Sequence, residues 1–302
     1  MALLKFKVMK NNSLNLKKAF FLTFSIICLL FAGCKKNNTE FATVNVRVSD
    51  FSITQEDINS RQDPASYEAV KAVTLAFYGS SGYEAYKYTQ YKDNTSTYTT
   101  FGTFTATLPV GNYTLVAVAY AYNDGDVFTL TSPTEAGYTS ERPRETFCPT
   151  QAVTVPNATT LNLNVELNRI SSMLQILSTD GRPAEATKIR TTFSKGGKGF
   201  DPTTGLATTD AGFSQINNPS SSVGNNIQVS IFPFLYTNEE TMNVTIEALD
   251  ADNNVLITNT INEVPFKRNR KTILTGQVYT PSNSGASFTL NTDWLEDVNV
   301  PF

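Results

Sequence analysis

The segment 161–168 reads LNLNVELN, with an apolar side chain at every second position and a polar one between. Because successive side chains of a β-strand point to opposite faces, this pattern predicts a strand with one buried face and one face in water. The alternation recurs at Val44, Val46 and Val48, which have polar residues between them. No window carries a 3.6-residue apolar period over more than about two turns, so an all-β chain is expected.

Further strands and turns follow the same logic. Two more strands are predicted where Val73, Leu75 and Phe77 alternate with Thr74 and Ala76, and where Val244, Ile246 and Ala248 alternate with Thr245 and Glu247. YGSSG at 78–82, NDGD at 123–126 and DNN at 252–254 supply turn residues between strands. The Asp124-Gly125 pair is a hairpin signal. One-sided strands joined by such turns favour antiparallel sandwiches.

The segment LPVGNY at 108–113 is a more specific motif. Pro109 restricts φ for a turn, Gly111 allows a positive φ, and Tyr113 begins the next strand. This motif resembles the hairpins of transthyretin-like sandwiches. We therefore expect two tandem transthyretin-like antiparallel β-sandwich domains, at 41–168 and 169–302. A single larger sandwich is the structural alternative.

The first 33 residues have the character of a targeting segment. They hold five lysines and no acidic residue, an apolar run from Ala19 to Leu30, and then FAGC at 31–34. This order predicts a signal peptide over 1–33, and the apolar run is too short to span a bilayer. Translation could begin at Met1 or at Met9. The FAGC ending resembles the lipobox of bacterial lipoproteins, which implies acyl chains on Cys34 and a tether over 34–40.

Composition excludes several functional classes. The chain contains no histidine, which rules out a Ser-His-Asp triad, a Cys-His dyad and any His-ligated metal site. Without residues 1–33 it keeps 19 basic and 27 acidic side chains, and a net charge of −8 disfavours nucleic-acid binding. Cys148 is then the only cysteine besides Cys34, so no internal disulfide is expected. We expect Cys148 to be a small apolar filler or a partly exposed thiol.

Three acidic clusters are weak candidates for chemistry. DADNN at 250–254 imitates the start of a calcium loop but has Val255 and Ile261 where the loop needs Gly and Glu, which favours a hairpin tip. Asp293, Glu296 and Asp297 flank Trp294 and could serve a glycosidase or a sugar platform, although a core tryptophan with solvated acids explains them as well. Glu239-Glu240 is expected in a polar turn. No catalytic residue, metal or cofactor is predicted.

Four features in order suggest a family. The lipobox ends at Cys34, an alternating strand covers Phe41 to Ser49, a loop with Asn59-Ser60-Arg61 leads into AVKAVTLAFYG at 69–79, and a second all-β half ends in VPFKRNRKT at 264–272. Together they resemble the fimbrillin superfamily, the lipoprotein fimbrial subunits and fimbrial anchors of Gram-negative anaerobes. The Asn168-Arg169-Ile170 junction and the PFKRN segment are most similar to the minor-subunit and anchor branch.

The resemblance implies a surface protein that works by strand exchange. It implies a lipid anchor in the outer membrane, other fimbrial subunits as partners, and a role in cell adhesion. In polymerising members a protease cuts after an Arg in the loop that follows the first strand, a position that Arg61 matches, whereas anchors keep the lipid and the first strand. The strand with Val44, Val46 and Val48 would leave a groove, and the C-terminal stretch with Phe288 and Leu290 is a candidate donor.

Two other functions remain open from the sequence alone. A surface lipoprotein that captures glycans for uptake would share the lipid anchor, the acidity and the β architecture. A carboxylate-based hydrolase would need a carboxylate pair inside a concave pocket. We expect that the protein is not an enzyme.

Overall fold

The computed structural model describes residues 40–52, 61–62, 69–123, 125–140, 142–219, 226–281 and 288–291. Over these residues the chain is all-β, as predicted, and its helical element is the single turn η1 at Thr95–Thr97. In this part of the chain, no helix has the length and apolar character needed to cross a membrane. Residues 41–302 form one compact unit, so the predicted division near residue 168 stays a prediction.

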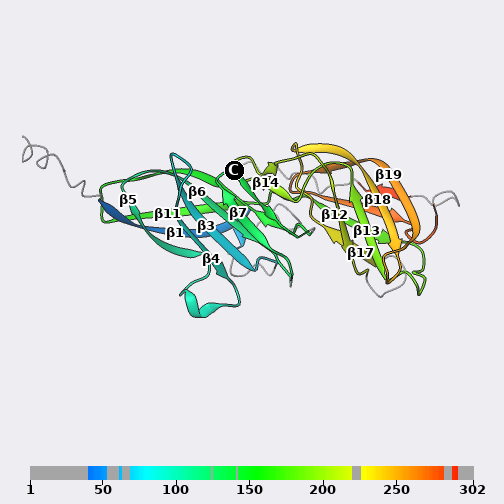
Figure 1. Cartoon of the computed structure of the whole chain (residues 1–302). Coiled ribbons are helices and arrows are strands. Elements are labelled where there is room, and N and C mark those ends of the chain that lie inside the picture. Colours follow the sequence, from blue (N-terminus) through cyan, green and yellow to red (C-terminus); the bar gives the residue numbers. More distant parts are fainter. Residues whose placement is uncertain are drawn as a thin grey trace, which may run out of the picture. The chain divides into compact units, whose positions relative to one another are not determined.

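Two facing sheets build a first sandwich from residues 41–168 (Figure 1). One sheet has the order β11-β1-β2, with β5 also paired to β1, and the other has the order β10-β6-β3-β4, with β9 paired to β6. Their core is one apolar cluster that contains Phe77, Leu115 and Leu167. The strands are β1 Phe41–Ser52, β2 Arg61–Gln62, β3 Ala72–Gly79, β4 Glu84–Tyr91, β5 Thr103–Pro109, β6 Gly111–Tyr120, β9 Thr146–Phe147, β10 Thr150–Val155 and β11 Thr160–Asn168.

A second pair of sheets follows in the chain. One has the order β17-β12-β20-β21 and the other β16-β13-β18-β19, and a separate apolar cluster with Ile176, Ile246 and Leu274 forms their core. The strands are β12 Met173–Ser178, β13 Lys188–Phe193, β16 Phe213–Asn217, β17 Asn226–Ile231, β18 Glu239–Leu249, β19 Val255–Lys267, β20 Lys271–Gly276 and β21 Phe288–Asn291.

A fifth sheet takes strands from both halves of the chain. Its order is β15-β14-β8-β7, built from β7 Phe128–Ser132, β8 Glu135–Tyr138, β14 Gly199–Asp201 and β15 Leu206–Ala207. A third apolar cluster joins this sheet to the outer faces of β3 and β6, and it includes Tyr120, Tyr138, Phe200 and Phe234. Both halves of the chain thus contribute strands to the layer that covers the first sandwich, which the sequence pattern did not predict.

Strand β3 shows the consequence of this layer. The sequence predicted that Thr74 and Ala76 would face water, but Thr74 is 4% exposed and Ala76 is fully buried. Val73, Leu75 and Phe77 pack in the first core, while Ala76 packs in the third cluster. The prediction was wrong because the fifth sheet covers the second face of β3.

Three of the five described sheets are antiparallel as predicted, whereas the other two each contain one parallel pair, which the sequence did not predict. Strand β1 runs parallel to β11, with Val46 opposite Leu163, and β12 runs parallel to β20, with Ile176 opposite Leu274. In each half the first strand thus lies beside a late strand of the same half. Each of these pairings joins strands more than 90 residues apart, so no short turn signal in the sequence could reveal it.

Two predicted hairpins are crossings between sheets. LPVGNY connects β5 in the first sheet to β6 in the second, and the Tyr113 hydroxyl holds the bend by donating to the Pro109 carbonyl at 2.9 Å. Burial raises the pKa of Tyr113 to about 12. NDGD connects β6 to β7, which also belong to different sheets. The YGSSG turn does form the predicted hairpin, between β3 and β4.

The pairing of β8 with β14 depends on two facing glycines. A Cβ atom on Gly137 would lie 2.5 Å from the Gly199 Cα and 2.9 Å from the Lys198 carbonyl oxygen. Because both are backbone atoms, Gly137→Val should force the strands apart and lower the free energy of unfolding by about 1–3 kcal/mol. Calorimetry should show one transition for the wild type and separate, earlier melting of one half for the variant.

Gly111→Val is the matched control. A Cβ atom at Gly111 would meet only the Tyr113 ring, at 3.7 Å, which is an ordinary contact. This variant should melt as the wild type does. An unchanged calorimetric profile for Gly137→Val would contradict the view that the β8–β14 pairing couples the two halves.

Candidate functional site

Strand β1 is the middle strand of its sheet. It pairs with β11 on one side and with β5 on the other, where Val44 lies opposite Ala106 and Val46 opposite Phe104. Its inward side chains are almost fully enclosed, with exposed fractions of 2% for Ala42, 0% for Val44, 1% for Val46 and 3% for Val48. We call the position that β1 occupies between β11 and β5 the β1 slot.

The inward face of β1 covers the first core. Ala42 and the three valines belong to the same cluster as Phe104, Leu108 and Leu167. Burial of four small aliphatic side chains contributes roughly 6–10 kcal/mol before conformational entropy is subtracted. An empty β1 slot would thus expose apolar surface together with two rows of unpaired backbone groups.

The outward face of β1 is polar and hydrogen-bonded across three strands. The Asn45 amide donates to Asn162 on β11 at 3.0 Å, and the Thr105 hydroxyl on β5 donates to the Asn45 side-chain oxygen at 3.0 Å. These bonds lie at the surface, where water competes for the same groups. The inward face and the backbone ladder therefore hold β1 in place.

The topology makes β1 separable from its sheet. Its two main partners, β5 and β11, begin more than 50 and more than 100 residues further along the chain. Neither neighbour is joined to β1 by a hairpin, so removal of β1 would break no tight turn. The nearest element in sequence is the two-residue strand β2, which pairs with the end of β1.

The residue predicted for proteolytic processing and the residues predicted for strand donation lie in different sheets. Arg61 was expected in an open loop, but it lies in β2 opposite Ser52. Phe288 and Leu290 lie in β21, the outer strand of its sheet, opposite Gly276 and Leu274 of β20. Arg61 thus lies beside the end of β1, whereas Phe288 and Leu290 pair with β20 and not with β5 or β11.

Several predictions lie outside the described residues. They concern the lipidation of Cys34, the signal peptide and tether, and the acidic residues around Trp294.

The two motifs that resemble the anchor branch meet in the structure. Arg169 is 7% exposed, and its guanidinium donates to Glu145 at 2.7 Å and to the Asn269 side-chain oxygen at 3.0 Å. It also lies over the Phe147 ring, 5.1 Å from the ring centre. The Asn269 backbone N–H donates to the Ser171 carbonyl at 3.1 Å. The junction is thus held by a buried ion pair and an amide from the PFKRN segment.

Arg169→Met should lower the free energy of unfolding by about 3–5 kcal/mol, because it leaves the buried Glu145 carboxylate without this cationic partner. The exposed Arg142 provides a matched control, and Arg142→Met should change stability by less than about 0.5 kcal/mol. Urea unfolding of both variants measures the difference. Equal stability of the two variants would show that the ion pair does not hold the junction.

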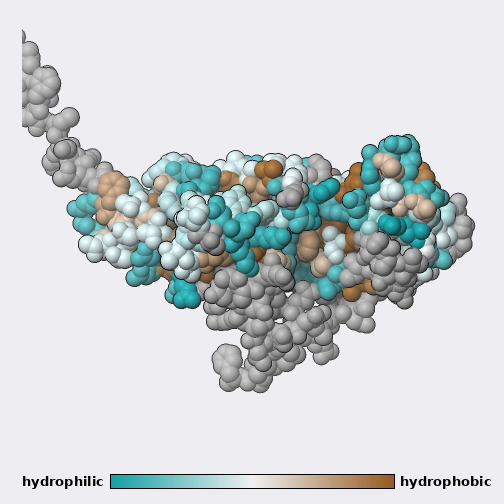
Figure 2. Space-filling model, turned by 90° about the horizontal axis from the view of Figure 1, so that it is seen from below, coloured by the Kyte–Doolittle hydropathy of each residue, from teal (hydrophilic) through white to brown (hydrophobic). Residues whose placement is uncertain are grey.

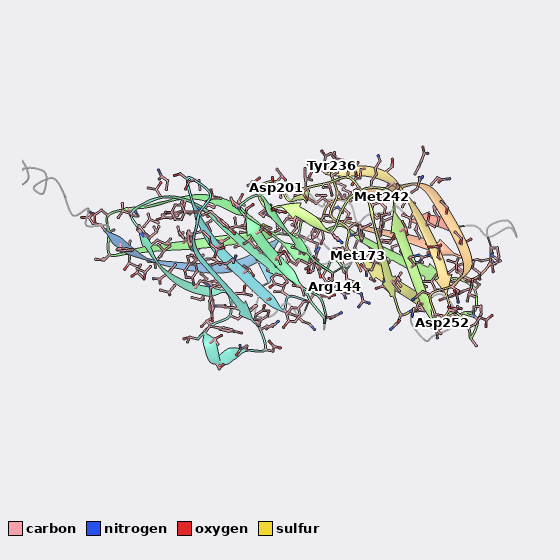
Figure 3. The ribbon with its side chains drawn as sticks, in the orientation of Figure 1. Arg144, Met173, Asp201, Tyr236, Met242 and Asp252 are labelled. Carbon is pink, nitrogen blue, oxygen red and sulfur yellow. The ribbon has the colours of Figure 1, made fainter. Side chains whose placement is uncertain are left out.

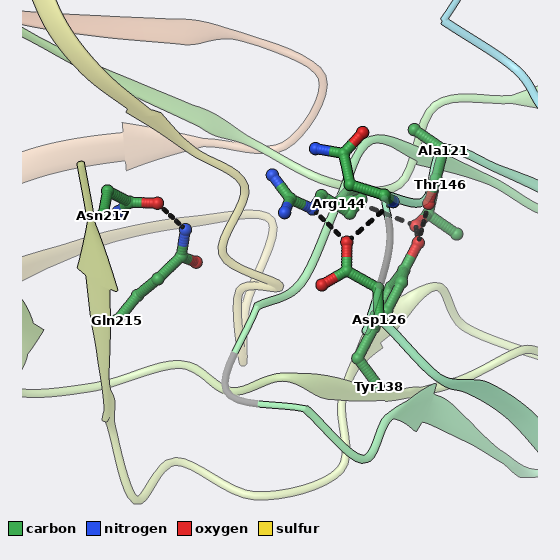
Figure 4. Close-up of polar contacts among 8 residues, drawn as sticks. Ala121, Asp126, Tyr138, Arg144, Thr146, Gln215 and Asn217 are labelled. Atoms are coloured by element: carbon green, nitrogen blue, oxygen red, sulfur yellow. Dashed lines mark hydrogen bonds and ion pairs between the residues drawn. The ribbon is translucent and has the colours of Figure 1, made fainter. Parts of the chain in front are cut away.

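A second set of enclosed polar contacts lies near the junction (Figure 4). Arg144 donates to Asp126 at 2.7 Å, and the Asp126 side chain is only 1% exposed. The Tyr138 hydroxyl donates to the Ala121 carbonyl at 3.1 Å and contacts the Thr146 hydroxyl at 3.2 Å. Burial raises the pKa of the Tyr138 hydroxyl, which stays protonated as a donor.

Cys148 lies in the third cluster. It is 5% exposed, and burial raises the pKa of its thiol, so the prediction of a small apolar filler is confirmed. A protonated, enclosed thiol of this kind is a poor nucleophile.

The acidic candidates serve structural roles. Asp250 closes the hairpin between β18 and β19, where its carboxylate accepts from the backbone N–H groups of Asp252 and Asn254, each at 2.9 Å. Asp252 is labelled at this hairpin in Figure 3. The Asn254 side-chain amide also donates to the Asp250 carboxylate, at 2.8 Å, and this bond together with the backbone bonds lowers the pKa of Asp250. The predicted hairpin tip is thus confirmed. In the described part of the chain, no group of three or more acidic or cysteine side chains could hold a metal ion.

The prediction for Glu239-Glu240 was wrong. Both residues open β18, where Glu239 pairs with Lys267 at 2.6 Å and Glu240 accepts from the Tyr236 backbone N–H at 3.0 Å. Two adjacent acidic residues are typical of a solvated turn, which is why a turn was predicted here. The cationic partner of Glu239 is Lys267, which lies on β19, across the strand pair.

The surface offers no extended apolar area on the side drawn in Figure 2. Hydrophobic residues appear there as small separate areas among hydrophilic ones.

A family model described as a family of unknown function (DUF6562) matches residues 43–299. The chain belongs to this family. The matched range begins inside β1 and ends beyond β21, so it includes both sandwiches and the shared sheet. No curated protein matches the chain.

Solved structures share the fold at low sequence identity. A candidate adhesin from Bacteroides ovatus superimposes with a TM-score of 0.51 at 11% identity, over 85% of this chain and 97% of that chain. A candidate polysaccharide-binding protein (DUF1812) from Bacteroides thetaiotaomicron gives 0.50 at 10% identity, over 78% and 91%. The fimbrial anchor protein Mfa2 from Porphyromonas gingivalis gives 0.46 at 10% identity, over 83% and 95%. At 10–11% identity, these likenesses show that the chain shares an all-β fold with those structures.

Proposed function

We propose that this protein is a structural component of a surface fimbria, as a subunit or as its anchor, and that it supports adhesion and assembles by β-strand exchange. The observation that carries the proposal is the position of β1, a middle strand with a fully apolar inner face and no hairpin to either neighbour. The fold shared with adhesin-like structures supports the proposal.

Strand exchange would work through the β1 slot. Among the described strands, β1 is the one that pairs with β5 and with β11, so when β1 leaves, these two strands are held by the core that they share with the facing sheet. The slot between them then presents backbone donors and acceptors on both sides. An incoming strand with apolar residues at alternate positions restores the ladder and the burial.

Proteolysis at Arg61 would couple release of β1 to release from the membrane. In this proposal Cys34 carries the lipid and residues 35–40 form the tether in the outer membrane. A cut after Arg61 would free the lipid, the tether and β1 in one step. An uncut chain would keep its lipid and its own strand, as an anchor needs.

The two forms are distinguished by their N-termini. Mass analysis of the protein recovered from the cell surface should find acylated Cys34 if the chain is an anchor, and a free Gln62 if it is a processed subunit. A mature N-terminus at any other residue would contradict both forms of the proposal.

The C-terminal strand β21 is the proposed donor. It is four residues long and lies at the outer edge of its sheet, so it has one strand partner among the described residues. Phe288→Ser with Leu290→Ser should reduce recovery of fimbrial partners with the tagged protein, as should deletion of residues 286–302. The first sandwich should still fold, which near-ultraviolet circular dichroism of its tyrosines can check. Unchanged partner recovery from both variants would exclude β21 as the donor.

A further inference from the structure

A groove opens between β4 and β5, on the side of β5 that faces away from β1. These strands are the outer strands of two facing sheets, and the groove between them has a volume of about 430 Å³. That volume lies within the roughly 300–1,000 Å³ of small-molecule sites. The loop after β4, which carries η1, forms its third wall and extends away from the sheets in Figure 1. We call this feature the tyrosine groove.

Hydrogen bonds hold the walls of the tyrosine groove in place. Gln90, which is 2% exposed, donates to the Thr103 carbonyl at 2.7 Å and accepts from the Gly102 backbone N–H at 2.7 Å. The Tyr98 hydroxyl donates to the Tyr91 carbonyl at 2.6 Å. These bonds hold the loop at Tyr91, where it leaves β4, and at Gly102 and Thr103, where it enters β5. Little further ordering of the loop is therefore needed when a ligand binds.

Aromatic rings form part of the lining. Tyr86 and Tyr88 come from the same face of β4, Tyr98 comes from the loop, and Phe104 comes from β5. Tyr88 is 37% exposed, and an edge contact with Phe104 at 6.5 Å between ring centres helps to fix its ring. A partly exposed ring with a polar tip offers an apolar face and a hydroxyl to the same ligand.

Hydroxyl groups form the rest of the lining. Five threonines between positions 97 and 105 line the groove, and none of its lining residues carries a carboxylate, an ammonium or a guanidinium group. Each hydroxyl can both donate and accept a hydrogen bond. A charged ligand would find no counter-charge there, so the lining favours a neutral ligand rich in hydroxyl groups.

We propose that the tyrosine groove binds a neutral oligosaccharide chain. A sugar ring presents C–H groups on its faces and hydroxyls on its edges, which matches tyrosine rings flanked by threonine hydroxyls. A peptide strand added to β4 or β5 would instead need apolar pockets spaced for alternate side chains, and the threonine-rich lining does not supply them. The groove is distinct from the β1 slot, because β1 pairs with the opposite edge of β5, and the two are connected through the hydrogen bond from Thr105 to Asn45.

Affinity electrophoresis of the soluble chain from residue 35 to 302 tests this proposal. The gels contain laminarin, yeast mannan, xyloglucan, dextran or soluble starch, with polygalacturonate as an anionic comparison. We expect at least one neutral polysaccharide to retard the protein and Tyr88→Ala to weaken that binding at least tenfold. Tyr236→Ala, at a 49% exposed tyrosine between β17 and β18, is the matched control and should bind as the wild type does.

Three outcomes would overturn the proposal. They are no retardation by any neutral polysaccharide, equal retardation of wild type and Tyr88→Ala, and retardation by polygalacturonate alone. A synthetic peptide of residues 286–300 is tested in parallel by fluorescence anisotropy. Peptide binding that Tyr88→Ala abolishes, without polysaccharide binding, would assign the groove to a protein strand instead.

Discussion

A disulfide that ties β1 to β5 should abolish incorporation of the protein into surface assemblies as a processed subunit, the form that gives up β1. Asn45 and Thr105 lie directly opposite each other on antiparallel strands, and their side chains are in hydrogen-bond contact at 3.0 Å. Opposite residues of such pairs have Cβ atoms about 4.5–5.5 Å apart, so Asn45→Cys with Thr105→Cys should oxidise readily. With β1 retained in its slot, no other strand can enter. Partner recovery after oxidation, compared with recovery in dithiothreitol, measures the effect.

The locked protein should be more stable than the wild type, not less. A disulfide across a loop of this length contributes about 4 kcal/mol in the chain-entropy model. Loss of assembly together with a raised melting temperature therefore separates blocked exchange from misfolding. Thr245→Cys with Thr260→Cys is the control, because these residues are also opposite and hydrogen-bonded at 3.1 Å, on β18 and β19. This pair should assemble normally when oxidised.

Val46→Asp should be the most destabilising substitution in β1. Val46 is 1% exposed in the first core, so the change removes apolar burial and encloses a carboxylate among aliphatic side chains. We expect a loss of at least about 4 kcal/mol in the free energy of unfolding at neutral pH. Urea unfolding followed by tyrosine fluorescence measures it.

The loss should depend on pH in a defined direction. Burial raises the pKa of the introduced carboxyl in the folded state above its unfolded value. The folded state then holds the proton more tightly, so the penalty is largest above the folded pKa and shrinks as pH falls through it. Arg47→Asp is the control, on the same strand but on its exposed face, and should change stability by about 0.5 kcal/mol or less. Similar losses for both variants would contradict the assignment of the inner face.

Local patterns predicted the strands well. The alternation at Val44, Val46 and Val48 matches buried positions, and Asn45 and Arg47 face outward as expected. The hairpin at 78–82 and the tip at 250–254 also form as predicted, since glycine, asparagine and aspartate favour such turns through local geometry alone.

Pairing between distant strands could not be predicted in this way. The parallel β1–β11 contact joins segments more than 100 residues apart, and nothing in either segment marks its partner. The same holds for β8 and β14, whose close approach needs the facing Gly137 and Gly199.

The candidate site was predicted in part. The first strand and its apolar residues were identified, but not that β1 is a middle strand with neighbours on both sides. Arg169 and the PFKRN segment were singled out by resemblance, while the ion pair with Glu145 and the contact with Asn269 depend on the fold. The tyrosine groove was missed, because its two walls come from strands of different sheets.

Photocrosslinking from the wall of the β1 slot tests strand exchange most directly. Thr105→p-benzoylphenylalanine places the probe on β5 directly opposite Asn45. In the free protein, mass spectrometry should find the crosslink on residues 41–52 of the same chain. In surface assemblies we predict a crosslink to a strand of another chain. If the assembled protein still crosslinks only to its own residues 41–52, exchange at the β1 slot does not occur.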